Sequence, residues 1–431
     1  MAKRILIGLI ALLIIGVLGL FALAWHPALA PIEPPAAASF SPELIATGEI
    51  LAGAGNCAAC HTAPDGKPYA GGLGLATQFG TIYSTNITPD ADTGIGRWSQ
   101  AAFARALHEG VDSEGAQLFP AMPYTHFTKV GDADLNALYA FLMTRPAVKA
   151  EEKTNSVPFP FNVRALQAGW KLLFFNRGAY QADPGKSEEW NRGAYLVQGL
   201  GHCAGCHTPL NSLGAEKPNE PYAGARIAGW YAPALNAANT APIKWSADEL
   251  FAYLRTGLTA RHGAAAGSMA EVVHEGLAKL PDADVHAIAT YLSPMTSSDA
   301  AAAAAGEAKA LAFAAGSASH DLDEGAGLYR AACSSCHYNS GSAPSMARPE
   351  LAFSTSLTLP DPTNLVHLIM DGVARQRTMA GFFMPGYAAG LTDTEIANLT
   401  TYLRASRTGL APWTDVEATV KAIRKQDEGM K

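Results

Sequence analysis

The chain has few charged residues, and they carry no excess of positive charge. Lysine and arginine number 31 against 38 aspartate and glutamate, the formal net charge is −7, and charged residues make up only 16% of the 431 residues. Without a basic surface the sequence gives no sign of nucleic-acid binding, and it lacks the polar tracts of a disordered chain. The 41 glycines and 27 prolines favour short helices joined by long irregular loops over large sheets.

Cysteine is also scarce, and no cysteine lies outside one repeated motif. All six belong to three C-x-x-C-H motifs, which run from Cys57 to His61, from Cys203 to His207 and from Cys333 to His337. In this motif two thiols bond to the vinyl groups of a haem, and the adjacent histidine becomes the proximal iron ligand. The motifs therefore predict three covalent haem c groups. The attachment residues are Cys57, Cys60, Cys203, Cys206, Cys333 and Cys336, and the proximal ligands are His61, His207 and His337.

Three other uses of a Cys-x-x-Cys pair fit the pattern less well. A structural zinc site needs four protein ligands, so two of the motifs would pair and the third would be left alone. A redox-active dithiol does not need a histidine after every pair. Disulfides are permitted outside the cytoplasm, which is also where c-type haems are attached.

The amino terminus contains one long apolar run. Lys3 and Arg4 precede 21 uncharged residues from Ile5 to Trp25, which is enough to span a bilayer and longer than the apolar region of an ordinary signal peptide. We expect a membrane anchor over residues 1–30. A cleaved signal is the alternative, because Ala28 to Ala30 resembles a cleavage site, although Pro31 would follow the cut. Both interpretations place residues 31–431 on the periplasmic side of the cell inner membrane.

The sequence around each haem motif repeats in one order. A short amphipathic helix leads into the motif, a second helix ends at a glycine, and an amphipathic helix closes the repeat. The three expected closing helices are Asp132 to Met143, Asp282 to Leu292, and Thr392 to Arg404, where Thr392 and Glu395 form a capping box. This order resembles the class I cytochrome c fold, and it predicts a mainly α protein with three tandem domains of that type after the amino-terminal transmembrane helix. The expected domains are 40–145, 188–296 and 321–408, with linkers at 146–187 and 297–320 and a tail helix within 409–431.

One methionine in each repeat is a candidate distal ligand, since histidine and methionine together give an electron-transfer haem of raised potential. Met122 lies 61 residues after His61, and Met269 lies 62 residues after His207. Met384 lies 47 residues after His337, and proline follows it as it follows Met122; Met379 is its rival. The other histidines considered as distal ligands do not recur at equivalent positions, and His367 is the first alternative in the third repeat. They are His108, His126, His202, His262, His274 and His367.

Several further segments make the resemblance more specific. They are Tyr83 to Asp90, Phe119 to Tyr124, Trp190 to Val197, Gly201 to Pro209 and Met384 to Tyr387. With the three motifs, they resemble the triple-haem cytochrome c subunit of membrane-bound alcohol and aldehyde dehydrogenases and related sugar-acid dehydrogenases of oxidative bacteria. The resemblance implies an electron-transfer subunit of a respiratory chain, without catalytic residues of its own.

The resemblance also implies partners. Electrons would come from a catalytic dehydrogenase subunit and pass to ubiquinone, and a small iron-sulfur subunit is a further candidate partner. The segments Gly169 to Gly178 and Met269 to Val273 favour a molybdenum-type aldehyde dehydrogenase over a quinoprotein alcohol dehydrogenase. Two other functions stay open at this point. One is a haem enzyme such as a peroxidase, which needs an open iron site, and the other is a stand-alone multihaem shuttle.

Three segments outside the repeats carry separate expectations. The apolar cluster Trp170 to Phe175 is expected to pack between domains, with contact to membrane or quinone as the alternative. The alanine-rich connector from Ser297 to Ser319 is expected to be partly helical. The tail from Thr414 to Gln426 is expected to form a helix that either embraces a neighbouring subunit or stays solvated.

Overall fold

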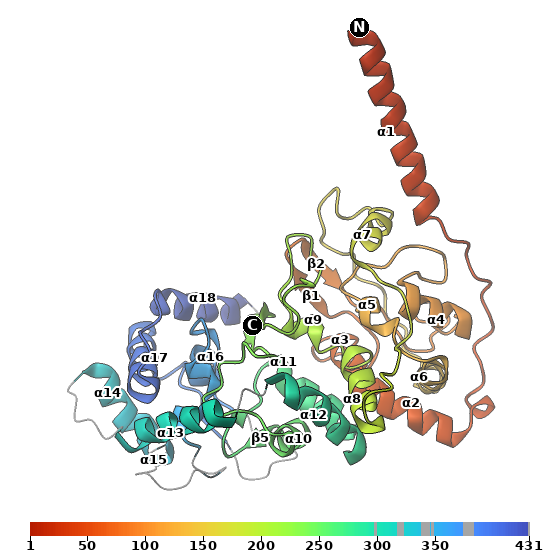
Figure 1. Ribbon diagram of the computed structural model, residues 1–431. Helices are drawn as coiled ribbons and strands as arrows, with labels where there is room; N and C mark the ends of the chain where they lie inside the picture. Colours follow the sequence, from red (N-terminus) through yellow and green to blue (C-terminus); the bar gives the residue numbers. More distant parts are fainter. Residues whose placement is uncertain (297–299, 317–322, 338–344, 346–348, 374–382, 430–431) are drawn as a thin grey trace. The chain divides into compact units, whose positions relative to one another are not determined.

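The computed structural model describes residues 1–296, 300–316, 323–337, 345, 349–373 and 383–429. These residues are mainly helical, as the sequence predicts (Figure 1). Their strands form three two-stranded antiparallel hairpins: β1 (Gly74–Thr77) with β2 (Gly80–Tyr83), β3 (Ala225–Ile227) with β4 (Trp230–Ala232), and β5 (Leu258–Thr259) with β6 (Gly263–Ala264). The chain divides into two compact units. The first unit comprises residues 1–186, 194–202 and 212–215, and the second comprises 187–193, 203–211 and 216–431.

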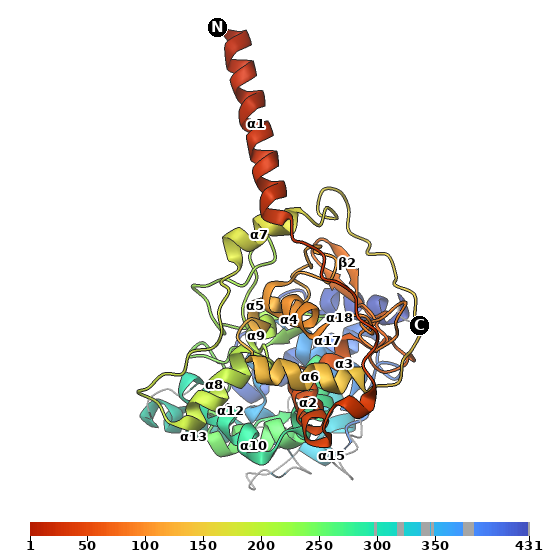
Figure 2. The same cartoon turned by 90° about the vertical axis from the view of Figure 1, so that its right-hand side faces the viewer.

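The first unit contains the long amino-terminal helix and the first haem motif. Its helices are α1 (Ala2–Ala24), η1 (Ala37–Ser39), α2 (Pro42–Ala54), α3 (Cys57–Cys60), α4 (Gln100–Glu109), α5 (Tyr124–Phe127), α6 (Asp132–Met143) and α7 (Leu166–Phe174). Helix α1 stands away from the rest of this unit in both views, with α7 beside its lower end (Figures 1 and 2). By length and composition α1 can cross a membrane.

Local sequence signals explain where the helices of the first unit begin and end. The Ser99 hydroxyl accepts a hydrogen bond from the backbone of Ala102 and caps α4, which stops at Gly110 because that residue adopts a left-handed conformation with φ of 62°. Helix α6 has the predicted bounds, and its apolar face buries Leu135, Leu138 and Leu142.

Helix α8 (Glu188–Gln198) belongs to both units, and the second unit carries the remaining two haem motifs. Its helices are α9 (Ala204–His207), α10 (Ala247–Thr256), α11 (Ser268–Glu271), η2 (Val272–Gly276), η3 (Leu277–Lys279), α12 (Asp282–Thr296), α13 (Ala300–Gly316), α14 (Glu324–Leu328), η4 (Tyr329–Cys333), α15 (Ser334–His337), η5 (Leu351–Phe353), η6 (Thr355–Leu357), α16 (Thr363–Asp371), α17 (Asp393–Thr408) and α18 (Val416–Gly429). The predicted capping box and a glycine that ends a helix are present here. Thr392 and Glu395 cap α17 reciprocally, and Gly257 ends α10 with φ of 75°.

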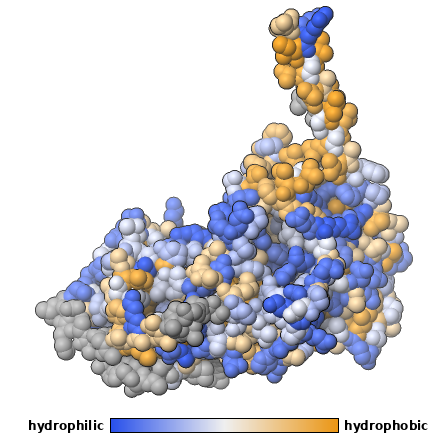
Figure 3. Space-filling view, in the orientation of Figure 1, coloured by the Kyte–Doolittle hydropathy of each residue, from blue (hydrophilic) through white to orange (hydrophobic). Residues whose placement is uncertain are grey.

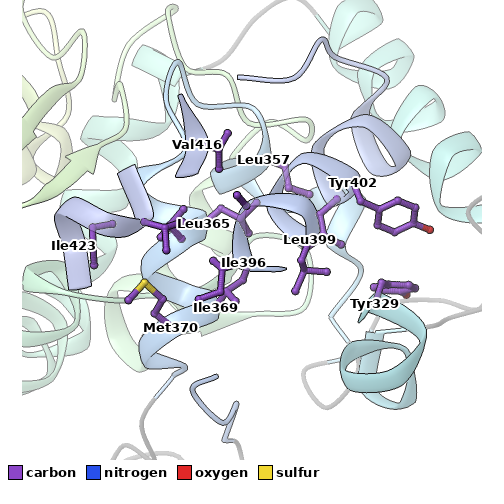
Figure 4. Close-up of a cluster of buried hydrophobic side chains, with 14 of the residues drawn as sticks. Tyr329, Leu357, Leu365, Ile369, Met370, Ile396, Leu399, Tyr402, Val416 and Ile423 are labelled. Carbon is purple, nitrogen blue, oxygen red and sulfur yellow. The ribbon is translucent and has the colours of Figure 1, made fainter. Parts of the chain in front are cut away.

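The core around α17 contains the tail of the chain. Tyr329 lies beside Tyr402, and Ile423 of α18 lies beside Leu365 and Met370 of α16 (Figure 4). Val416, Val420 and Ile423 are all buried in this cluster. The expectation that the tail embraces a neighbouring subunit or stays solvated is therefore wrong. The helix is present, but its apolar face packs on the core of its own unit.

Two connecting segments also have definite packing. The alanine-rich connector forms α13, and Ala310 and Phe313 of that helix pack against Phe353. In the first unit Trp170 and Phe175 pack edge-on against Tyr124, with ring centroids 6.3 and 5.3 Å apart. The Trp170 indole N–H also donates to the carbonyl of Leu213 at 2.9 Å. Within this unit Trp170 therefore contacts a residue of each of the first two expected domains, as predicted.

Candidate functional site

The three histidines predicted as proximal ligands share one hydrogen-bonding arrangement. Each Nδ1 lies near a backbone carbonyl oxygen: His61 is 2.7 Å from that of Thr85, His207 is 2.6 Å from that of Pro233, and His337 is 3.1 Å from that of Pro349. A carbonyl only accepts, so this partner assigns the proton to Nδ1 and leaves the Nε2 lone pair for a metal. Burial lowers the pKa of all three histidines, with the carbonyl bond acting in the opposite direction. This arrangement supports the predicted role of all three histidines as proximal iron ligands.

A glycine after each of the first two haem motifs holds the chain against the backbone of the histidine. The backbone N–H of Gly71 donates to the His61 carbonyl at 2.8 Å, and that of Gly224 donates to the His207 carbonyl at 2.8 Å. Both glycines have positive φ, 73° and 85°, and a methyl group at Gly71 would overlap the backbone of Thr85. Glycine is therefore required where the chain turns back beneath the histidine.

The thiols do not have the chemistry of a redox-active dithiol. Burial raises the pKa of Cys57 and of Cys203 to about 12 and that of Cys333 to about 11, and the second cysteine of each motif adds to the effect. A dithiol exchange site needs the opposite shift, because the thiolate is the nucleophile. Among the described residues, no three side chains of the His, Cys, Asp and Glu types are grouped as a metal site.

Two candidate distal methionines occupy loops that are held by equivalent backbone hydrogen bonds. The N–H of Leu118, four residues before Met122, donates to the carbonyl of Gly110 at 2.7 Å. The N–H of Ala265, four residues before Met269, donates to the carbonyl of Gly257 at 2.7 Å. In both loops the chain returns to the glycine that ends the second helix. The shared geometry supports the same proposed role for Met122 and Met269, which are both partly buried.

The loop of Met384 returns to the second helix at a different point. Met384 itself exchanges two backbone hydrogen bonds with Val373, at 2.9 and 3.1 Å. Three residues later the Tyr387 hydroxyl donates to the carbonyl of Ala332, the residue before Cys333, at 2.9 Å. The described part of the loop is thereby fixed beside the third haem motif, which supports Met384 as the proposed ligand. Its rival Met379 lies outside the described residues.

The alternative histidines have other contacts. His367 stacks on Trp230, and its two nitrogens lie 2.9 Å from an Asp371 carboxylate oxygen and 3.2 Å from the Gly229 carbonyl oxygen. His262 stacks on Trp245 at 3.6 Å between ring centroids. The remaining four also have neighbours: His108 bonds Val130, His126 bonds Gln198, His202 packs on Phe127, and His274 lies against Gly257. These contacts speak against His367 as the third distal ligand.

A buried cation fits the haem that the third motif implies. Arg407 is only 1% exposed, its guanidinium lies 4.7 Å from the centre of the Tyr329 ring, and its charge acts on His337. Its Nε and Nη2 have no hydrogen-bond partner among the described residues. Burying an unpaired guanidinium costs on the order of several kcal/mol, so a buried arginine normally has an anionic partner. A haem propionate would supply the negative charge and the two acceptor oxygens that pair with a guanidinium.

The comparisons with known proteins identify the family. The family model described as cytochrome c matches residues 45–146, and the model described as cytochrome C oxidase, cbb3-type, subunit III matches residues 320–403. The chain is 38% identical to the fructose dehydrogenase cytochrome subunit of Gluconobacter japonicus, over 91% of this chain and 84% of that one. It is 37% identical to the gluconate 2-dehydrogenase cytochrome c subunit of Pantoea cypripedii, over 89% of this chain and 90% of that one. The chain belongs to the cytochrome c subunits of bacterial dehydrogenases.

A third relative has a greater length. The chain is 47% identical to a nicotinate dehydrogenase subunit of Pseudomonas putida over 89% of this chain. It spans only 32% of the length of that relative.

The family confirms several predictions made from the sequence. This cytochrome c subunit has the expected mainly α fold with cytochrome c domains, it carries covalent haem c at its three motifs, and it is itself an electron carrier. The individual iron ligands and the boundaries of the three domains remain predictions.

Sequence reasoning missed Arg407. An arginine in the last turn of a helix is usually explained by its interaction with the helix dipole, and the sequence contains no signal of its burial. Its position five residues after Tyr402, on the face that meets Tyr329, is apparent only once α14 and α17 are packed together.

Proposed function

We propose that this cytochrome c subunit receives electrons from a dehydrogenase catalytic subunit on the periplasmic side of the inner membrane and passes them to ubiquinone. The observation that carries the proposal is the set of three haem motifs, each with a histidine oriented by a backbone carbonyl, in a relative of dehydrogenase cytochrome subunits. Each bound haem supplies a one-electron redox centre. Met122, Met269 and Met384 are the proposed sixth ligands, which would raise the potentials and leave no haem open for peroxidase chemistry.

Helix α1 serves in this proposal as an uncleaved anchor. Residues on both sides of the candidate cleavage site after Ala30 bond to the first unit. The Leu29 N–H donates to the Ser113 carbonyl at 2.8 Å, and the Ile32 N–H donates to the Arg97 carbonyl at 3.0 Å. Gln117 donates to the carbonyl of Ala24, the last residue of α1, at 2.9 Å. Cleavage would remove Ala24 and Leu29 and leave the buried Gln117 amide without this acceptor, which argues against it.

The catalytic partner determines the substrate. Sequence motifs favour a molybdenum-type aldehyde dehydrogenase and, next, a quinoprotein alcohol dehydrogenase. The 47% identity to a nicotinate dehydrogenase subunit adds nicotinate to the candidate substrates. A small iron-sulfur subunit, if the complex contains one, would carry electrons from the catalytic subunit to the first of the three haems that accepts them.

The test is the native complex, isolated through a tag on this chain. We expect its largest partner to be a dehydrogenase. Anaerobic addition of the substrate of that partner should reduce all three haems, and a short-chain ubiquinone should then reoxidise them. The proposal fails if no dehydrogenase subunit copurifies, or if the partner turns over with quinone while the haems stay oxidised.

A further inference from the structure

An exposed apolar area surrounds α7 at the foot of α1. We call it the α7 surface. Six large apolar residues form it, with exposed fractions between 37% and 80%: Phe159, Phe161, Val163, Leu166, Leu172 and Leu173. Figure 3 shows an apolar region on the body directly below α1, where Figure 1 places α7. The adjacent leucines Leu172 and Leu173 are 70% and 68% exposed. A soluble surface rarely presents so many large apolar side chains together.

The opposite side of α7 is firmly packed, so its outer face is fixed in orientation. Ala168 is buried, and Trp170 packs on Tyr124. The Lys171 ammonium donates to the carbonyl oxygens of Glu109 and Gly110 at 2.6 and 2.7 Å. These contacts hold the leucines outward, although an apolar helix face normally turns toward the core.

The depth of α7 follows from its contact with α1. A methyl group placed on the α-carbon of Gly169 would lie 3.7 Å from a side-chain carbon of Leu20, so the two helices are in close contact there. Leu20 lies four residues before the end of α1, which is about 6 Å along a helix axis. Trp25, just after α1, is 72% exposed, and tryptophan is typical of the membrane interface. A bilayer that covers the apolar length of α1 therefore reaches the level of α7.

One polar network holds both helices at this level. The Gln117 amide donates to the Ala24 carbonyl at 2.9 Å, and its oxygen accepts from Lys171 at 2.6 Å. The end of α1 and the buried side of α7 are therefore attached to the same side chain. This shared attachment fixes the height of one helix relative to the other.

We propose that the α7 surface inserts into the outer leaflet of the membrane as a second, in-plane contact beside α1. Amphipathic helices of this kind bury their apolar face about 5–10 Å into the interface, and the contact at Leu20 places α7 in that range. The first unit is thereby held close to the lipid in a fixed orientation. This inference rests on the proposed role of α1 as a membrane anchor.

The experiment uses the full-length holoprotein, without partner subunits, in lipid nanodiscs of phosphatidylethanolamine and phosphatidylglycerol. A small environment-sensitive fluorophore is attached to one introduced cysteine in L172C, and its quenching by brominated lipid is compared with its quenching by aqueous iodide. The native cysteines are bonded to haem and do not react. Both quenchers act on the same labelled variant, so quenching of its fluorophore by the haems affects both measurements equally and cancels in the lipid-to-iodide ratio.

Two control positions make the outcomes distinguishable. In T47C the label lies on the exposed side of α2, away from α1 in Figures 1 and 2, and in L12C it lies on α1. We expect the lipid-to-iodide quenching ratio of L172C to exceed that of T47C several-fold and to approach that of L12C. A ratio equal to that of T47C while L12C is in lipid would overturn the inference and leave the anchor intact. That result would indicate that another protein covers this surface in the complex. An aqueous label in L12C would overturn the anchor, and the inference with it.

Discussion

Gly48 of α2 lies directly against the backbone carbonyl of Ala137 in α6, so closely that a methyl group at residue 48 has no space. The same relationship recurs in the second unit. A methyl group at Gly193 would overlap the Ala287 carbonyl, and one at Gly325 would lie 2.5 Å from the Asn398 carbonyl oxygen. In every case the aromatic residue four positions further along the closing helix flanks the contact. These residues are Phe141, Tyr291 and Tyr402. The first and last helices of each haem repeat therefore cross at a glycine.

This crossing predicts a strong effect of Gly325→Val. The valine side chain has to displace either α14 or α17, and overpacking of this kind typically costs about 1–3 kcal/mol or more. We expect the third haem to lose its normal spectrum while the other two keep theirs. Gly327→Ala on the same short helix is the matched control, because nothing lies within 4 Å of its Cβ position. Thermal unfolding followed by haem absorbance distinguishes the two variants, and equal stability of both would contradict the crossing.

Met384→Ala tests the proposed distal ligand of the third haem. Loss of the sulfur ligand should abolish the sulfur-to-iron charge-transfer band of one haem of three, lower its potential and open it to added ligands. Met122→Ala and Met269→Ala should each do the same to another haem. Met379→Ala is the comparison, and we expect it to leave all three haems low-spin. If Met379→Ala removes the band and Met384→Ala does not, the assignment is reversed.

Arg407→Met tests the proposed partner of the third haem. A buried positive charge beside a haem favours the reduced state, so its removal should lower the midpoint potential of one haem and leave the other two unchanged. Arg407→Lys keeps the charge and should restore much of the potential. A spectroelectrochemical titration separates the three haems. If the two variants shift the potential equally, the effect comes from lost packing and not from charge.

The carboxylate of Glu249 makes the second unit sensitive to acid. Burial would raise its pKa, but the His262 ring, whose Nε2 lies 3.5 Å from the carboxylate, and the hydrogen bonds donated by Ser246 lower it to about 2 from the ordinary 4.5. A carboxylate whose pKa is lower in the folded state than in the unfolded state stabilises the fold fully above pH 4.5. This contribution disappears as the pH falls through about 2. Glu249→Gln should therefore weaken the dependence of unfolding on pH across this window, whereas Asp248→Asn at the exposed neighbouring position should not. Acid titrations followed by far-ultraviolet dichroism measure the difference, and parallel curves for E249Q and the wild type would refute it.

Much of the fold could be predicted from local sequence. Thr392 and Glu395 identify the start of α17, and Gly110 and Gly257 identify the ends of α4 and α10, because caps depend only on adjacent residues. The three motifs specify haem attachment for the same reason. These are signals that a short segment carries by itself.

The predictions that failed depend on tertiary partners. An amphipathic pattern indicates that a face is covered but does not say by what. The pattern of the tail helix is therefore equally compatible with another subunit as its partner, although Val420 is buried in its own unit. For the same reason the burial of Arg407 and the split of α7 into a packed and an exposed side could not be read from composition.

The central claim is that one chain holds three haems, and the intact mass of the purified chain tests it most directly. We predict a mass that exceeds that of the polypeptide by three haem groups, all resistant to acid extraction because they are covalently bound. A mass that corresponds to two haems or fewer would contradict this claim.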